Sequence, residues 1–226
     1  MNNNEKRYVP TITSTLRGHI IEVPDVIRKA TGIVILGKRI KSLIFSTDVA
    51  VIKNTNADAV MSVYPFTPQP IITQSLVSAS DVPVFCGVGG GTTTGKRVIN
   101  LALDAEFKGV MAVVLNSPTK NELIQGVRDV IDIPIVVTVI SEEEDFEARI
   151  KAGATIFNVS GAKDTAKIVR KLRNLYPEFP IIATGGPTDK SILETIEAGA
   201  NAITYTPPSN TEIMKVLMDK YRGQMD

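Results

Sequence analysis

Few side chains in this sequence could carry acid-base or nucleophilic chemistry, and two of them follow short apolar runs. Asp48 comes shortly after SLIFS, where a carboxylate can act as a general base or can cap the helix that follows. Lys163 follows ATIFNVS and could act as a catalytic amine or remain a solvated charge beside Asp164. The chain has one histidine, His19, and one cysteine, Cys86, too few for a transition-metal site or a Ser-His-Asp triad. We therefore expect metal-independent chemistry that uses Asp48 and Lys163.

A glycine-rich segment, CGVGGGTTTGKR at residues 86–97, offers backbone amides in place of charged side chains. Gly90, Gly95 and Lys96 have the spacing of a Walker A loop, but Arg97 stands where a serine or threonine would hold magnesium. We interpret the segment as a near miss of that motif. Successive glycines still let a backbone approach a ligand closely, so we predict a binding loop, with a simple barrel turn as the alternative. We call its predicted ligand-binding residues the glycine lip: Gly89, Gly90, Gly91 and Thr92.

Short apolar runs alternate with helical patterns from Lys41 onward. The runs are rich in Val, Ile and Ala throughout, which is typical of parallel strands buried on both faces. They recur at roughly 17 to 27 residues, the spacing of successive β/α units. The runs are SLIFS, AVMSVY, VPVFCGV, GVMAVVLN, IPIVVTVI, ATIFNVS, PIIATG and AITYT. This pattern predicts a single α/β domain, a (β/α)₈ TIM barrel over residues 41–226.

The segments between and before these runs carry helix signals. KNELIQGVRDVID places apolar residues along one helical face, and SEEEDFEARIKAG begins with a serine and three acids that suit a helix N-terminus. Residues 1–40 lie outside the repeating units, and HIIEVPDVIRKATGIVIL indicates a short helix followed by an extra apolar strand. We expect this extension to form a flap that closes the N-terminal end of the barrel, with plain core packing as the alternative.

The end of the chain carries a pattern found in phosphate sites. ATGGPTDKSILETIEAGANAI places two glycines directly after the seventh apolar run. It resembles the end of phosphate-binding TIM barrels, including the 2-keto-3-deoxy-6-phosphogluconate aldolases and the flavin-binding nitronate monooxygenases. The resemblance covers roughly the last 50 residues by motif and the whole chain by unit order. It implies that glycine backbone after strand seven, amides after strand eight and a helix N-terminus bind a phosphate. The further predicted ligand-binding residues are Gly161, Gly185, Gly186, Thr206 and Ser209.

The sequence departs from those families at several positions. Pro207 and Pro208 have no N–H to donate where a glycine and a small hydroxyl residue usually stand. Ser209 can still cap the next helix, whose first amides could receive an oxyanion. Asn158 occupies the stretch in which the aldolases carry their Schiff-base lysine, and NVSGAKDT lacks the histidine that the nitronate monooxygenases carry in that region.

Charge and composition narrow the function further. Lys plus Arg number 25 against 24 Asp plus Glu, so a net charge of +1 provides no broad field to attract nucleic acid or a membrane. We predict a lyase or isomerase acting on a small phosphorylated metabolite, with a homo-oligomer left open. One alternative is a non-enzymatic ligand-sensing barrel, similar in size and ending to the glycerol-uptake antiterminator regulators. Another is an FMN-binding oxidoreductase whose glycine segments hold the flavin phosphate.

The expected location is the cytoplasm. MNNNEKRYVPT has no apolar stretch like that of a secretory signal, and one cysteine cannot form an intrachain disulfide. No apolar run approaches the roughly 20 residues of a membrane-spanning helix.

Overall fold

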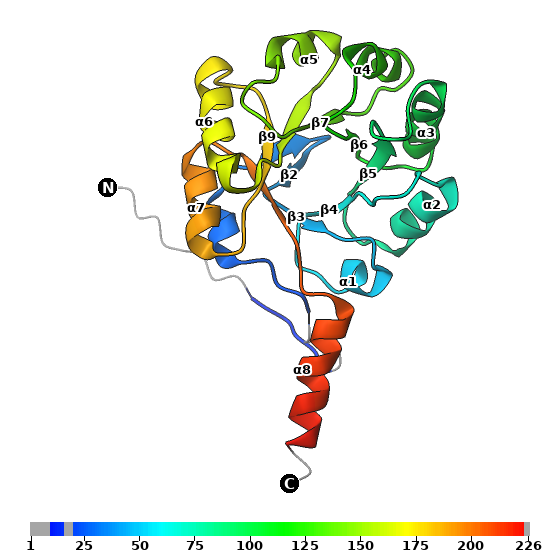
Figure 1. Ribbon diagram of the computed structural model, residues 1–226. Helices are drawn as coiled ribbons and strands as arrows, with labels where there is room; N and C mark the ends of the chain where they lie inside the picture. Colours follow the sequence, from blue (N-terminus) through cyan, green and yellow to red (C-terminus); the bar gives the residue numbers. More distant parts are fainter. Residues whose placement is uncertain (1–9, 16–19, 224–226) are drawn as a thin grey trace.

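Eight parallel strands form a closed barrel in the computed structural model, which describes residues 10–15 and 20–223 (Figure 1). The strand order around the ring is β10-β3-β4-β5-β6-β7-β8-β9. The barrel strands are β3 (Ser42–Phe45), β4 (Ala59–Ser62), β5 (Val84–Gly89), β6 (Ala112–Leu115), β7 (Ile135–Val139), β8 (Ile156–Val159), β9 (Ile181–Thr184) and β10 (Ala202–Tyr205). Each lies within a run predicted from the sequence, except that β5 continues to Gly89. The predicted single α/β barrel is therefore confirmed.

Helices alternate with the strands. They are α1 (Val49–Lys53), α2 (Pro70–Ala79), α3 (Lys96–Phe107), α4 (Asn121–Arg128), α5 (Phe146–Ala152), α6 (Thr165–Leu175), α7 (Asp189–Glu197) and α8 (Asn210–Arg222). The apolar face predicted for α4 is buried, at Leu123, Ile124 and Val127. None of the helices in residues 10–15 and 20–223 has the length and apolar character needed to cross a membrane.

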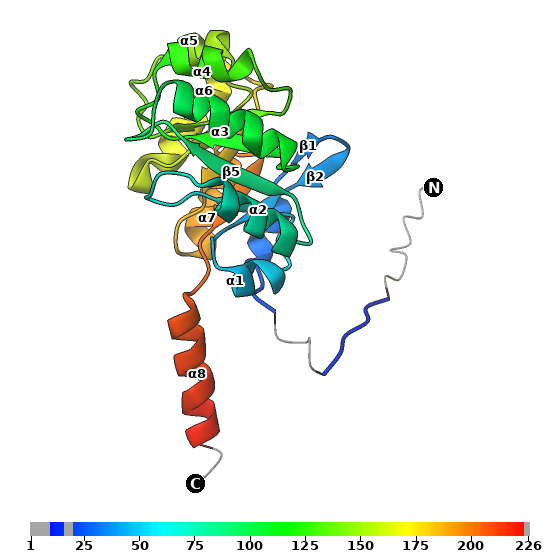
Figure 2. The ribbon, with the colours of Figure 1, turned by 90° about the vertical axis from the view of Figure 1, so that its right-hand side faces the viewer.

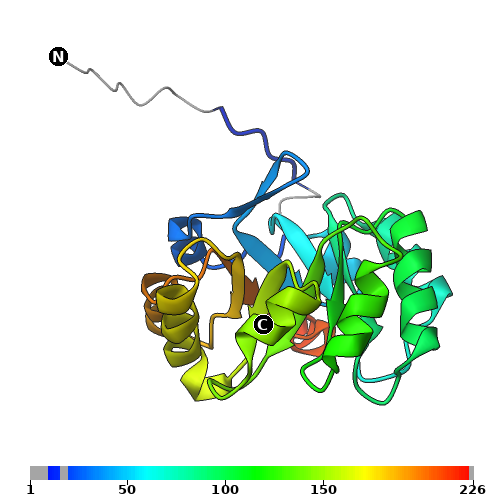
Figure 3. The same cartoon turned by 90° about the horizontal axis from the view of Figure 1, so that it is seen from above.

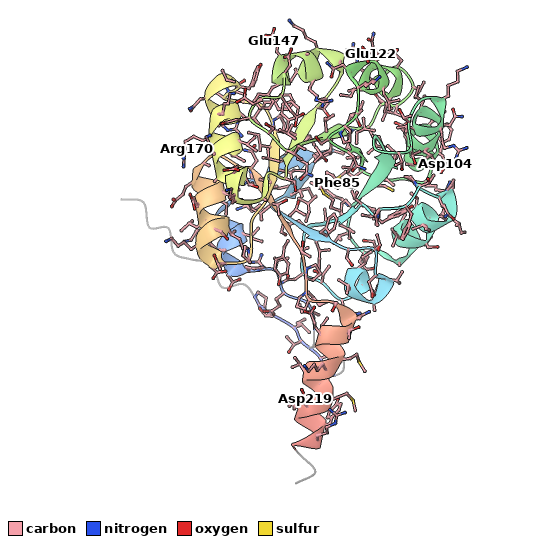
Figure 4. All side chains as sticks on the ribbon, in the orientation of Figure 1. Phe85, Asp104, Glu122, Glu147, Arg170 and Asp219 are labelled. Carbon is pink, nitrogen blue, oxygen red and sulfur yellow. The ribbon has the colours of Figure 1, made fainter. Side chains whose placement is uncertain are left out.

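Both faces of the barrel strands are buried, which explains why the strands lack polar alternation. Leu43, Met61 and Phe85 belong to a core cluster inside the barrel, and Figure 4 shows Phe85 within the ring. Their neighbours along the strands, such as Ile44 and Val60, belong to a second cluster that includes helix residues.

The N-terminal extension contributes a two-stranded hairpin to the inner core. Its strands are β1 (Ile33–Ile35) and β2 (Lys38–Ile40), which pair antiparallel. Ile33, Ile35 and Ile40 are buried in the same cluster as the inner strand residues, so the hairpin closes the N-terminal end of the barrel. Figures 2 and 3 show it projecting from the ring.

The extension also takes a place in the outer ring. The short 3-10 helix η1 (Asp25–Lys29) packs beside α7, and Ile27 is fully buried together with Val23 in the outer core. By contrast, α8 has no buried residue and extends away from the barrel (Figures 1 and 2). Residues from before the first barrel strand thus cover the surface that the last helix of such a barrel usually covers.

The helix predicted to start at Ser141 begins later, at Phe146. Asp145 caps it by accepting from the Ala148 amide at 2.9 Å. The preceding residues form a loop because Glu144 is engaged elsewhere, accepting from the Ile140 amide at 2.9 Å.

Candidate functional site

A polar layer lies at the C-terminal end of the barrel interior, where β/α barrels carry their sites. Alternation along β7, β8 and β10 turns Thr138, Asn158 and Thr204 to the same side as the inner core residues. Asn158 Nδ2 donates to Thr138 Oγ1 at 3.4 Å. Asn158 is 8% exposed, and its Oδ1 accepts no hydrogen bond from any described residue. A buried amide oxygen without a partner is costly, which marks this position as a candidate ligand contact.

A cleft of about 220 Å³ opens at the same end, between the loops that follow β4, β5 and β6. Its walls combine aromatic and proline side chains from the β4 loop with glycine backbone from the β5 loop. The lining residues are Val63, Tyr64, Pro65, Phe66, Pro68, Gly87, Gly89, Gly91, Thr92, Thr93 and Asn116. The cleft therefore offers an apolar wall opposite a wall of amides and hydroxyls.

The glycine lip has a backbone that only glycine adopts easily. Gly89 and Gly90 have φ of +132° and +100°. The Gly90 amide donates to Thr93 O at 2.9 Å, and Gly89 O accepts from the Asn116 amide at 3.0 Å, which fixes the turn. Over residues 10–15 and 20–223, the amides of Gly91 and Thr92 have no protein acceptor. Both residues are exposed at the cleft, so these amides are available to an anion.

Tyr64 supplies a hydroxyl to the cleft. Its oxygen accepts from the Gln69 amide at 3.1 Å. Burial raises the pKa of the Tyr64 phenol, and a smaller contribution from Cys86 acts in the same direction, while the Gln69 hydrogen bond opposes them. The phenol is therefore protonated at neutral pH, and its O–H can donate to a ligand oxygen.

Asp48 caps α1 in the structure. Its Oδ1 accepts from the Ala50 amide at 2.8 Å and the Val51 amide at 3.3 Å, while Oδ2 accepts from Asn210 Nδ2. The sequence left general base and helix cap open, and the geometry shows the cap. With both oxygens engaged, this carboxylate links the β3 loop to the start of α8.

Lys163 lies in the loop after β8, within the 3-10 helix η2 (Ala162–Asp164), and its side chain is exposed. In the described part of the chain it forms no ion pair, including with Asp164. Since β8 is opposite β4 in the strand order, the structure does not bring Lys163 into the cleft lined by Tyr64. The amide of Gly161, a predicted ligand donor, donates to Thr165 Oγ1 at 3.1 Å instead.

The two glycines after β9 have structural roles. A Cβ on Gly185 would lie 2.7 Å from Ile203 Cγ2 and 2.8 Å from Ile192 Cγ1, so its absence lets α7 pack closely. Gly186 has a φ of +80° and precedes a capping box that engages the first turn of α7.

The N-terminus of α8, predicted to form the second half of the phosphate site, carries a capping box. Ser209 Oγ accepts from the Glu212 amide at 3.3 Å, and Glu212 Oε2 accepts from the Ser209 amide at 2.7 Å. Hydrogen bonds from Ser209 lower the pKa of Glu212, so a negative charge stands at this helix N-terminus. Of the amides predicted to receive an oxyanion, that of Glu212 is taken by the capping box, whereas the Thr211 amide has no protein acceptor among the described residues. Thr206 is exposed in the linker before α8.

Only some of the predicted ligand-binding residues therefore lie together at the cleft. Gly89, Gly91 and Thr92 line the cleft and Gly90 shapes its wall, whereas the residues after β8, β9 and β10 lie elsewhere around the rim. Tyr64 and Asn116 were missing from the predicted site, although each is the last residue of one of the apolar runs. Phe66 was missed as well, and its signal is the aromatic, proline-rich segment YPFTPQP.

Metal ligands are sparse. Residues 10–15 and 20–223 contain no group of three or more His, Cys, Asp or Glu side chains that could hold an ion. His19 lies outside the described residues. Cys86 is buried, and its sulfur lies 3.3 Å from Thr73 Oγ1.

No protein family and no curated protein matches the sequence. The fold, however, is similar to solved structures. Phosphoenolpyruvate phosphomutase from Streptomyces platensis subsp. rosaceus is 13% identical with a TM-score of 0.62, over 87% of this chain and 83% of that one. A 2,3-dimethylmalate lyase of the PEP mutase/isocitrate lyase superfamily is 11% identical with a TM-score of 0.62, over 88% and 84%. Phosphonopyruvate hydrolase in complex with oxalate and magnesium is 12% identical with a TM-score of 0.59, over 82% and 81%. At these identities the similarity shows a shared TIM-barrel fold.

Proposed function

We propose that this chain is a TIM-barrel enzyme of the lyase or isomerase type that binds a small phosphorylated metabolite in the cleft between the β4, β5 and β6 loops. The observation that carries the proposal is the glycine lip, where Gly91 and Thr92 line the cleft and their amides have no acceptor among the described residues. Amides fixed by a rigid turn bind phosphate oxygens well because they need no reorganisation. The structural neighbours include a lyase and a phosphomutase, which is consistent with this class.

The size of the cleft favours a small metabolite over a flavin. Pockets for drug-sized ligands span roughly 300 to 1,000 Å³. The cleft here is about 220 Å³, so a molecule as large as FMN would extend well beyond it.

The proposed chemistry does not use a magnesium ion. The neighbouring phosphonopyruvate hydrolase was solved with magnesium. Among the described residues, no three His, Cys, Asp or Glu side chains lie close enough together to hold an ion, so the proposal places no magnesium ion held by protein side chains alone. We therefore assign charge stabilisation to backbone amides and to neutral donors.

In this proposal Tyr64 donates its phenolic proton in a hydrogen bond to the bound ligand, and Asn116 provides a second polar contact. Asn158, with its unpartnered Oδ1, contacts the end of a ligand that reaches into the barrel mouth. The sequence also predicts Lys163 and Asp48 as proton-transfer groups; in this structure Lys163 lies across the barrel from the cleft and Asp48 caps α1, so each would act only after its side chain moves. If Lys163→Ala and Asp48→Asn both leave a discovered activity intact, that assignment is wrong.

The first experiment is thermal unfolding of the pure protein titrated with inorganic phosphate, against chloride at matched ionic strength. A site filled to about 100 times its dissociation constant adds about 2.7 kcal/mol. In a chain of this size the midpoint should rise by roughly 5 to 10 °C. Such a rise would justify a screen of phosphorylated sugars and acids for turnover.

Matched variants locate the site. Tyr64→Phe and Asn116→Ala should reduce the phosphate-induced rise, whereas Ser209→Ala, at the capping box of α8, should leave it unchanged. If the rise in the midpoint depends on Ser209 and not on Tyr64 or Asn116, the anion binds at the N-terminus of α8, and the proposal is contradicted. Binding without turnover of any phosphorylated compound would favour a sensor over an enzyme.

A further inference from the structure

The mouth of the barrel is lined by neutral side chains that divide into an apolar and a polar part. Alternation along each strand turns one residue at or beside its C-terminal end toward the barrel interior. In ring order from β3 to β10 these residues are Phe45, Val63, Gly87, Asn116, Thr138, Asn158, Thr184 and Thr204. None of these eight residues can ionise. The last five belong to the consecutive strands β6 to β10, and we call them the polar arc.

The polar arc is only weakly satisfied by hydrogen bonds within the protein. Asn158 Nδ2 lies 3.4 Å from Thr138 Oγ1, and Thr184 Oγ1 lies 3.4 Å from Ser160 Oγ. Good hydrogen bonds of these kinds span about 2.7 to 3.0 Å. Asn158 is 8% exposed, and its Oδ1 has no donor among the described residues. Buried polar atoms are normally paired, so the arc has capacity for a ligand.

The polar arc is continuous with the cleft in which we place the phosphate. Asn116 belongs to the arc and also lines that cleft, as do its inward-facing neighbours Val63 and Gly87. Asn158, on β8, lies three strands around the ring from β5, which carries the glycine lip. At about 4.8 Å per strand, the two strands are at most about 14 Å apart. A ligand whose phosphate lies at the lip therefore reaches Asn158 only through a chain of several carbon atoms.

We infer that the end of the ligand opposite the phosphate is an uncharged, hydroxylated carbon chain, as in a sugar or sugar-alcohol phosphate, and is not a carboxylate. The inference rests on the proposed function and names the substrate class for the same site. A hydroxyl group both donates and accepts, so it can pair with Asn158 Oδ1 and with the threonine hydroxyls of the arc. It would also suit the Asn158 amide if oxygen and nitrogen were exchanged.

A carboxylate fits the polar arc poorly. It only accepts hydrogen bonds, so it would leave Asn158 Oδ1 without a donor. Burial of a carboxylate is costly unless a positive charge pairs with it, and none of the eight inward-facing residues supplies one. Lys163 follows β8 in sequence, but its side chain is exposed in the loop beyond the strand.

The test compares sorbitol 6-phosphate with 6-phosphogluconate by isothermal titration calorimetry. These probes differ only at the first carbon, which carries a hydroxyl group in one and a carboxylate in the other. The parent protein should bind sorbitol 6-phosphate at least roughly 10-fold more tightly, because the carboxylate would be buried without a partner. Inorganic phosphate is titrated in parallel, since it reports on the cleft alone.

Asn158→Leu removes the unpartnered acceptor at similar side-chain volume. It should weaken binding of sorbitol 6-phosphate by about 2- to 12-fold, the value of one hydrogen bond, and should leave the affinity for inorganic phosphate unchanged. The control Thr195→Val removes a buried hydroxyl group on α7, which donates to Ser191 O at 2.9 Å, and should change none of the affinities. Unfolding midpoints without ligand check that the variants fold. The comparison of the two probes on the parent protein needs no variant.

The inference and the proposed function can fail separately. Suppose that phosphate binding depends on Tyr64 and Asn116, but that 6-phosphogluconate binds as tightly as sorbitol 6-phosphate or more tightly. The inference is then overturned and the proposed function stands. If that tighter binding is lost in Lys163→Ala, Lys163 is the cation that pairs with the carboxylate. If neither phosphate nor either probe binds, the proposed function and the inference are overturned together.

Discussion

The glycine lip leads to a specific prediction about Gly90→Ala. Gly90 has a φ of +100°, and a Cβ built there would lie 1.8 Å from Thr119 Oγ1 and 2.9 Å from the backbone N of Asn116. The Thr119 side chain can rotate, but the Asn116 amide is fixed by its hydrogen bond to Gly89 O at 3.0 Å. The new methyl group must therefore displace backbone.

The size of the effect follows from two contributions. A side chain in the left-handed region costs about 1 kcal/mol, and forced overpacking costs about 1 to 3 kcal/mol more. Each kcal/mol lowers the midpoint by about 2 to 4 °C in a protein of this length, so the total fall should be roughly 4 to 16 °C.

Gly109→Ala separates the two contributions. Gly109 has a φ of +83°, but no atom lies within 4 Å of the position its Cβ would take. This variant should lose only the backbone contribution, about 1 kcal/mol or about 2 to 4 °C. Differential scanning calorimetry of both variants gives the comparison. Equal midpoints for Gly90→Ala and Gly109→Ala would refute the steric argument, and an intact phosphate response in Gly90→Ala would refute the role of the lip.

Two further predictions concern the loops around the cleft. Arg149→Ala removes hydrogen bonds to the carbonyls of Ser117 and Thr119. It also leaves the Glu144 carboxylate, 15% exposed, without its ion pair. The free energy of unfolding, measured in urea, should therefore fall by about 2 to 4 kcal/mol. The control Lys151→Ala breaks an exposed pair and should change the free energy of unfolding by less than about 1 kcal/mol. Burial raises the pKa of Tyr64, so its contribution to stability is present below the unfolded pKa of about 10 and is lost as pH rises through the folded value. The stability advantage of the parent over Tyr64→Phe should therefore be constant from neutral pH to about pH 9 and fall in more alkaline solution; a flat difference up to pH 11 would contradict it.

The barrel was predictable because its signal is local. Each strand needs only a short apolar run. A run such as IPIVVTVI predicts a strand buried on both faces, whatever the distant parts of the chain do. The turn of the glycine lip was predictable for a related reason, since GVGGGTTT has few conformational alternatives to a tight turn, whereas its ligand-binding role stays a prediction.

The phosphate site predicted at the end of the chain stays a prediction, but the sequence already showed a competing use for part of it. A serine followed three residues later by glutamate, Ser209 and Glu212, is the pattern of a capping box. The box engages the Glu212 amide, one of those predicted to bind phosphate.

The position of α8 was not predictable from its own residues. The same amphipathic pattern would suit a helix packed on the barrel. The place that α8 would take on the barrel is filled by Val23 and Ile27, which are buried there and lie far away along the chain. The residues of α8 alone do not indicate that another segment fills this place.

The junction between the two ends of the barrel has a consequence for synthesis on the ribosome. The amide of Gly32 donates to Asn201 O at 2.8 Å, and Asn201 Nδ2 donates to Thr31 Oγ1 at 3.0 Å. About 170 residues separate these partners, which at 5 to 20 residues per second means a delay of roughly 9 to 35 s during translation. For that time η1 lacks the α7 surface on which it packs, and Thr31 and Gly32 lack their Asn201 partner. A nascent chain of this protein should therefore depend on holding chaperones until the last strand emerges, however stable the finished barrel is.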